Sequence, residues 1–146
     1  MGVWAEFTLA AVTNALPTDI ATLHAAWVDA NPSKVNRLSE LVAETVRTFR
    51  DAVKANPLNG MDAAVNTIPS VAYHHALHWV IFNLGMEMGV QFAPQVYTLN
   101  TEANVWLRMV QNGGIPVDLM AEDGTPSYVQ LAMASDQRRC RWVNGG

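Results

Sequence analysis

Cysteine is almost absent from this sequence, which contains only Cys140 in 146 residues. A single thiol excludes an internal disulfide and a zinc site built from several cysteines. We therefore expect synthesis in a reducing cytoplasm. The first residues also lack the basic segment of a secretory signal peptide, so we expect no export leader.

Charged residues are also scarce, at 15% of the chain, whereas hydrophobic residues make up 50% and include five tryptophans. Soluble domains contain roughly 25% charged residues. The formal net charge of −4 disfavours a protein whose main task is to bind phosphate groups. A small chain with so much apolar surface buries it best in an oligomer or a larger assembly.

Enzyme signatures are missing as well. The sequence has no phosphate-binding loop, no G-x-S-x-G motif and no evident pair of catalytic carboxylates. Cys140 lies in a tail that ends in glycine, with no candidate histidine fixed nearby, which disfavours a catalytic thiol. We predict neither an enzymatic activity nor a cofactor.

Hydrophobic periodicity predicts a mainly α-helical fold. A short helical turn capped by Thr8 precedes a first clear helix over residues 18–31. Asn31 as the N-cap and Pro32 as the first helical residue predict a long amphipathic helix that ends before Pro57. The inner positions are Ile20 and Leu23 in the first helix, and Val35, Leu38, Val42, Val46, Phe49 and Val53 in the second.

A central helix is predicted from about Pro69 to Gly89. It is apolar on almost all sides, so we expect protein to surround it in a small bundle of three to four main helices. Its three histidines disfavour a position in a membrane. "QFAPQVY" is expected to be a connector to a last helix that Asn100 or Thr101 caps and Gly113 ends. The inner stripe of the last helix is Ala103, Trp106 or Leu107, and Val110.

The helical pattern ends near Ile115. "IPVDLMA" and "SYVQLAM" alternate weakly around the turn signal "EDGT", which predicts a β-hairpin or an extended arm. We therefore divide the chain into a helical domain, residues 1–114, and a C-terminal arm, residues 115–146. The end of the arm, "RRCRW", is typical either of a contact with a protein partner or of a solvated tail.

The histidines of the central helix raise the question of a metal site. His74 and His78 are four residues apart and would share one helix face. The zinc protease motif H-E-x-x-H needs a glutamate as its general base, but His75 follows His74 here. No third ligand is evident either. We predict no metal, and expect the histidines to form hydrogen bonds at a packing or subunit interface.

The order of these segments resembles the head–tail connector proteins of tailed bacteriophages, also called adaptor or head-completion proteins. "RLSELVAETVRTFRDAV" is similar to the long helix of that family. "IPSVAYHHAL" resembles the start of its central helix, and "ANVWLRMVQNGGI" resembles its next helix. The resemblance covers roughly residues 17–117 and concerns helix order, length and end signals. "KANPLNGMDA" departs from the segment that often follows the long helix in the family.

This resemblance implies a structural protein of the virion neck. Its copies would form a ring, in the family a dodecamer, which joins the portal protein to a tail terminator, a stopper or another neck protein. Genomic DNA would pass through the ring without sequence-specific binding, and the arm would contact the portal. The subunit would be made in the cytoplasm of the bacterial host and would contact no membrane. The candidate interface residues are Arg138, Arg139, Arg141, Trp142, Tyr128, His74 and His78.

Two other functions stay open at this level. One is a small helical DNA-binding or regulatory protein, although the basic residues of the long helix alternate with acidic ones. The other is a metal-binding helical-bundle enzyme that uses His74 and His78.

Overall fold

Five α-helices and a two-stranded sheet make up residues 3–117, the part of the chain that the computed structural model describes. The predicted mainly α-helical fold is confirmed, whereas the predicted hairpin or arm lies outside the described residues from position 118 onward. The elements are β1 (Trp4–Glu6), α1 (Leu9–Ala15), α2 (Thr18–Ala30), the 3₁₀ turn η1 (Pro32–Lys34), α3 (Arg37–Lys54), β2 (Thr67–Pro69), the 3₁₀ turn η2 (Ser70–Ala72), α4 (Tyr73–Met88) and α5 (Pro94–Gln111).

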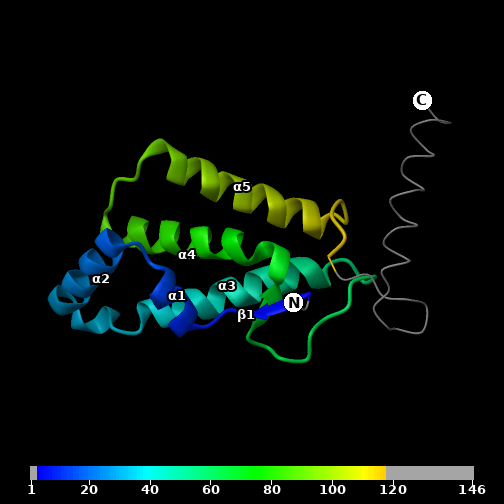
Figure 1. The fold of residues 1–146 in the computed structure, drawn as a ribbon, viewed down its shortest axis with the longest axis horizontal. Coiled ribbons are helices and arrows are strands. Elements are labelled where there is room, and N and C mark those ends of the chain that lie inside the picture. Colours follow the sequence, from blue (N-terminus) through cyan, green and yellow to red (C-terminus); the bar gives the residue numbers. More distant parts are fainter. Residues whose placement is uncertain (1–2, 118–146) are drawn as a thin grey trace.

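The apolar helix α4 is central, as its sequence predicts. It lies between α3 and α5 (Figure 1) and also contacts α2. Ala76, Val80 and Leu84 are fully buried along it. The helix stops at Gly89, whose φ of +78° lies in the left-handed region that favours glycine.

The amphipathic helix α3 supplies much of the core. Its buried residues recur at helical spacing on one side, as predicted, while the other side carries charged residues. The predicted inner position Val35 is wrong, because this residue precedes α3 and is 59% exposed. Phe49 is fully buried, and its ring centroid lies 5.5 Å from that of Trp79 and 5.8 Å from that of Trp106. This aromatic cluster joins α3 to both α4 and α5.

The long helix starts later than predicted. The segment after Asn31 forms η1, and α3 begins only at Arg37. The side chain of Asn31 donates a hydrogen bond from Nδ2 to the carbonyl of Trp27, 3.0 Å away. It is therefore a second donor to a carbonyl that already accepts the backbone N–H of Asn31 at the end of α2, and it does not cap the helix that follows.

The last helix starts earlier than predicted. It begins at Pro94, whose fixed φ suits a first helical position, so part of the expected connector is helical. The hydroxyl of Thr101 donates to the carbonyl of Tyr97 at 2.9 Å, an i to i−4 bond inside the helix. The predicted inner stripe is confirmed at its buried positions, Ala103, Leu107 and Val110.

Helix α2 is more exposed than predicted. Ile20 is its one buried residue, whereas Leu23, which we placed on the inner stripe, is 46% exposed. The helix lies at one end of the bundle (Figure 1), where few elements can cover it.

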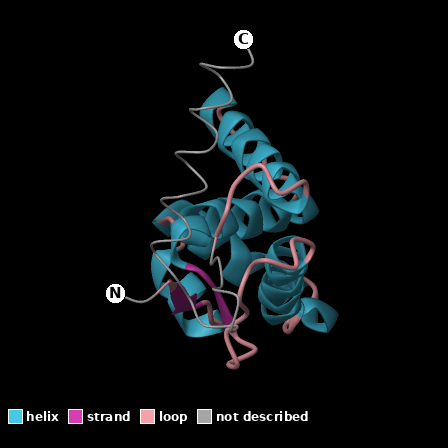
Figure 2. Ribbon diagram, turned by 90° about the vertical axis from the view of Figure 1, so that its right-hand side faces the viewer, coloured by secondary structure: helices cyan, strands magenta, loops and turns pink. Residues whose placement is uncertain are grey.

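The small sheet was not predicted from the sequence. β1 and β2 pair in antiparallel fashion, with Trp4 opposite Pro69 and Glu6 opposite Thr67. Figure 2 shows the two strands side by side at the edge of the helical body. Strands of three residues are too short for an alternating pattern to reveal them.

Arg50 attaches the segment between α3 and β2 to the helices. Its Nη1 lies 3.0 Å from the carbonyl oxygen of Ala64 and 2.9 Å from that of Thr67, and its Nη2 lies 2.6 Å from that of Asp62. Its guanidinium also lies 5.2 Å from the ring centroid of Trp4. One side chain of α3 therefore holds this segment and both strands in place.

Candidate functional site

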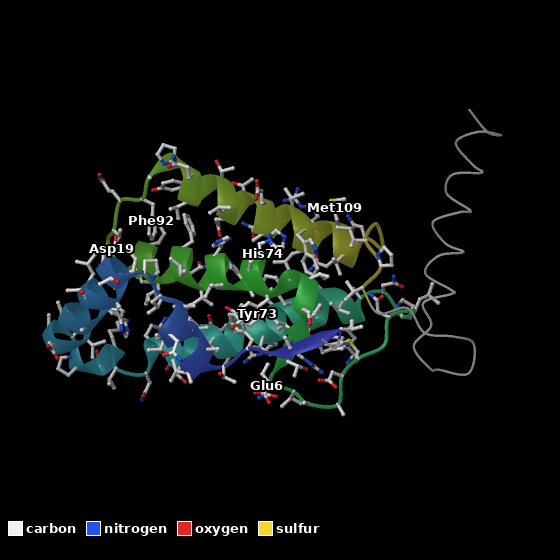
Figure 3. All side chains as sticks on the ribbon, viewed as in Figure 1. Glu6, Asp19, Tyr73, His74, Phe92 and Met109 are labelled. Carbon is white, nitrogen blue, oxygen red and sulfur yellow. The ribbon has the colours of Figure 1, made fainter. Side chains whose placement is uncertain are left out.

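The three histidines lie together near the start of α4, where Figure 3 labels His74. The ring centroid of His74 lies 4.1 Å from that of His75 and 6.0 Å from that of His78. His74 is exposed, whereas His75 and His78 are partly buried. The closeness of His74 and His78 follows from helical spacing, because positions four residues apart are neighbours on an α-helix, whereas His74 and His75 are adjacent in the chain.

The surroundings of His75 and His78 favour the neutral form of each ring. Burial lowers the pKa of both below the ordinary value of 6.5, and the nearby His74 lowers both further, while Glu102 of α5 opposes this change. The Nδ1 atoms of His75 and His78 are buried and have no hydrogen-bond partner among residues 3–117. Within this part of the chain, the expected hydrogen bonds of the histidines are therefore not formed at these two atoms.

The described residues do not assemble a metal site around these histidines. Within residues 3–117, no group of three His, Cys, Asp or Glu side chains is arranged to hold a metal ion. His75, at the position where a zinc protease has its glutamate, stacks on the ring of Trp106 at 5.8 Å. In that part of the chain, His74 and His78 remain a pair without a third ligand.

An apolar groove runs along the outer side of α5. Its volume is about 540 Å³. Tyr97, Val105 and Met109 are all more than 40% exposed on it, and Glu102 is the one Asp, Glu, Lys or Arg in its lining. The lining residues are His75, Tyr97, Thr98, Thr101, Glu102, Val105, Trp106, Met109 and Ile115.

Sequence reasoning missed this groove because it considered only the inner stripe of the last helix. The signal is present in the sequence, since Tyr97, Thr101, Val105 and Met109 recur every four residues on another side of α5. His75 was also not singled out as an interface residue, although it is the histidine that lines the groove.

A second apolar surface lies where α1, α2 and η1 meet. Leu9 and Val35 are exposed there, beside a hollow of about 340 Å³, while Leu23 is exposed elsewhere on α2. Leu9 and Val35 line this hollow, together with His24. In Figure 1, α4 lies between α1 and α5.

Two arginines of α3 are engaged within the chain. Nε of Arg37 lies 2.8 Å from Oε1 of Glu87, and its Nη1 lies 3.3 Å from carboxylate oxygens of Glu40 and Glu44. These carboxylates raise the pKa of Arg37, with Glu87 making the largest contribution. Arg50 binds backbone carbonyls, as described above. The basic side of α3 therefore presents fewer free cations to an external anion than its sequence suggests.

The remaining sequence-predicted contact residues cannot be placed. Tyr128, Arg138, Arg139, Arg141 and Trp142 lie outside the described residues. Among residues 3–117, no helix combines the length and the hydropathy that a membrane crossing requires. No protein-family model, no curated protein and no solved structure matches the chain.

Proposed function

We propose that this protein is a structural subunit of a homo-oligomeric ring in the neck of a tailed bacteriophage. The ring would join the portal protein to a tail terminator, a stopper or another neck protein, and would extend the channel for genomic DNA. The order and end signals of the helices, which resemble those of head–tail connector proteins, support this assignment.

One observation carries the proposal. The described part of the chain leaves eleven large apolar side chains exposed, of which three line the α5 groove and two line the hollow beside α1. Isolated exposed apolar residues are ordinary, but hollows with apolar rims are typical of protein–protein contacts. Burying apolar surface gains roughly 25 cal/mol per Å², so association would stabilise such a subunit.

Two unlike surfaces favour a ring over a two-fold dimer. In a two-fold dimer, the same surface of each subunit meets itself. When one surface meets a different surface of the next copy, the contact repeats and closes into a ring if the rotation allows it. The α5 groove and the surface of α1, α2 and η1 provide such a pair on one subunit.

The charge of the chain suits passage of DNA better than binding of DNA. The formal net charge is −4, and acidic walls repel the phosphate backbone. The pairing of Arg37 with three glutamates reduces the basic surface that a DNA-binding protein would need. DNA would therefore move through the ring without being held.

The proposal is tested by the size of the purified full-length protein. We expect sedimentation velocity to show a large oligomer, alone or after addition of the portal protein, and negative-stain microscopy to show rings. Position of the gene beside genes for portal and major capsid proteins would add independent support. A protein that stays monomeric up to about 100 µM, with and without portal, would overturn the proposal.

A further inference from the structure

We infer that neighbouring subunits meet through a helix-in-groove contact, in which α2 of one copy docks into the α5 groove of the next copy. This contact rests on the proposed ring and specifies which two surfaces join. The occupant of the groove is therefore a second copy of this chain.

Helix α2 has the surface that such a contact needs. Ile20 is buried in the body of its own subunit, while Leu23 projects from the middle of the helix with 46% of its surface exposed. The exposed neighbours Thr22 and Ala26 are small, which lets another helix approach closely. A helix of 13 residues is marginally stable without packing, so docking would stabilise α2.

The groove is almost as long as α2. At 1.5 Å per residue, the 13 residues of α2 extend about 20 Å. The distance along α5 from Tyr97 to Met109 is about 18 Å by the same measure. With the two helices aligned at their centres, Leu23 would reach the apolar middle of the groove near Val105. An apolar helix side chain set into an apolar groove is a recurrent mode of recognition.

The charges on the two surfaces are compatible. α5 carries Glu102 near its middle and the exposed Arg108 toward its end, whereas the charged residues of α2 are Asp19 and Asp29, both exposed and near its ends. In either direction of docking, one aspartate would lie near Arg108, and Glu102 would face uncharged residues. If the α5 grooves of two copies met each other instead, the two Glu102 side chains would lie close together. Neither groove would then be filled by a helix.

Two full-length lysine variants test this contact. Val105→Lys blocks the groove and leaves α2 intact, and Leu23→Lys blocks α2 and leaves the groove intact. Both positions are exposed, so the subunit should tolerate lysine at each of them. A lysine at position 105 and a lysine at position 23 would also repel each other. Val65→Lys is the matched control, because Val65 is 78% exposed in the segment between α3 and β2, away from both surfaces.

We expect each blocked variant to weaken association at least about 30-fold and to sediment as a monomer, while Val65→Lys assembles like the wild type. An equimolar mixture of the two blocked variants should form a 1:1 heterodimer, because one intact groove and one intact α2 remain. Circular dichroism melts establish that each variant is folded. Met109→Lys and Ala26→Lys replace any variant that is not, since both positions are also exposed.

The outcomes separate this contact from the ring itself. A wild type that assembles while the mixture stays monomeric would refute the contact and leave the ring standing. Normal assembly of either blocked variant alone would also refute the contact and leave the ring standing. The groove would then have another occupant, such as the chain's own C-terminal residues. A wild type that never assembles would refute both.

Discussion

Replacing Gly85 with alanine should destabilise the protein, against the usual effect of this change in a helix. Gly85 is buried in α4, and a Cβ atom there would overlap the ring of Phe92. The Phe92 centroid lies 6.0 Å from that of Phe82 and 6.5 Å from that of Tyr97. Alanine would therefore displace Phe92 from an aromatic cluster that joins α4, the following segment and α5.

The opposing contributions can be estimated. Alanine is favoured over glycine inside a helix by about 1 kcal/mol. Displacing Phe92 loses two ring pairs at about 0.5–1.5 kcal/mol each. It also loses about 1–2 kcal/mol of the gain from partial burial. We expect Gly85→Ala to lower the free energy of unfolding by about 1–4 kcal/mol.

The effect of Gly85→Ala on the free energy of unfolding should change sign when the ring of Phe92 is removed. In a Phe92→Ala background, the added methyl group no longer meets a ring, and Gly85→Ala should raise the free energy of unfolding by about 0.5–1 kcal/mol. Urea unfolding of the wild type, both single variants and the double variant measures this coupling. Equal destabilisation by Gly85→Ala in both backgrounds would refute the proposed overlap with Phe92.

Three further changes test other contacts. Because the pKa of His75 and of His78 is lowered from 6.5, the unfolded chain binds more protons than the folded one as the pH falls below that value, so stability is lost in acid. The double change to glutamine should flatten the dependence of the urea midpoint on pH between 5 and 7, and an unchanged slope would contradict this cause. Arg50→Met should cost about 2–3 kcal/mol in thermal or urea unfolding, because it leaves three carbonyls without their charged donor, whereas the matched Arg47→Met on the exposed side should cost less than about 0.5 kcal/mol. Glu87→Gln should cost no more than about 1 kcal/mol in the same assay, because its ion pair with Arg37 is partly exposed to solvent, and a larger loss would show that the pair is structural.

Features encoded by neighbouring residues were predicted correctly. The side chain of Thr8 accepts a hydrogen bond from the backbone N–H of Ala11 and caps α1, as its type and position indicate. The stop of α4 at Gly89 was likewise predictable, because glycine readily adopts the left-handed conformation. The buried side of α3 follows from its spacing of apolar residues. Each of these features depends on contacts within a few turns of the chain.

Features that depend on distant residues were missed or misplaced. The pairing of Trp4 with Pro69 joins segments that are far apart in the sequence, and no local pattern marks either strand. Asn31 has the residue type of an N-cap, but its side chain donates to the carbonyl of Trp27 in α2. The candidate site likewise has a part that local sequence predicts and a part that depends on distant residues. The pattern showed that the histidines would cluster, but not that His75 would lie against Trp106 and line a groove.

The sequence by itself determined the helical class, the central position of the apolar helix and the surplus of apolar residues over charged ones. These properties follow from residue type and spacing, which act locally. Only the tertiary structure decided where the surplus lies. Packing of α4 against α3 and α5 buries one set of apolar residues and leaves Tyr97, Val105 and Met109 outside. Which side of a helix stays exposed depends on its neighbours, and the position of those neighbours is not encoded in the helix's own residues.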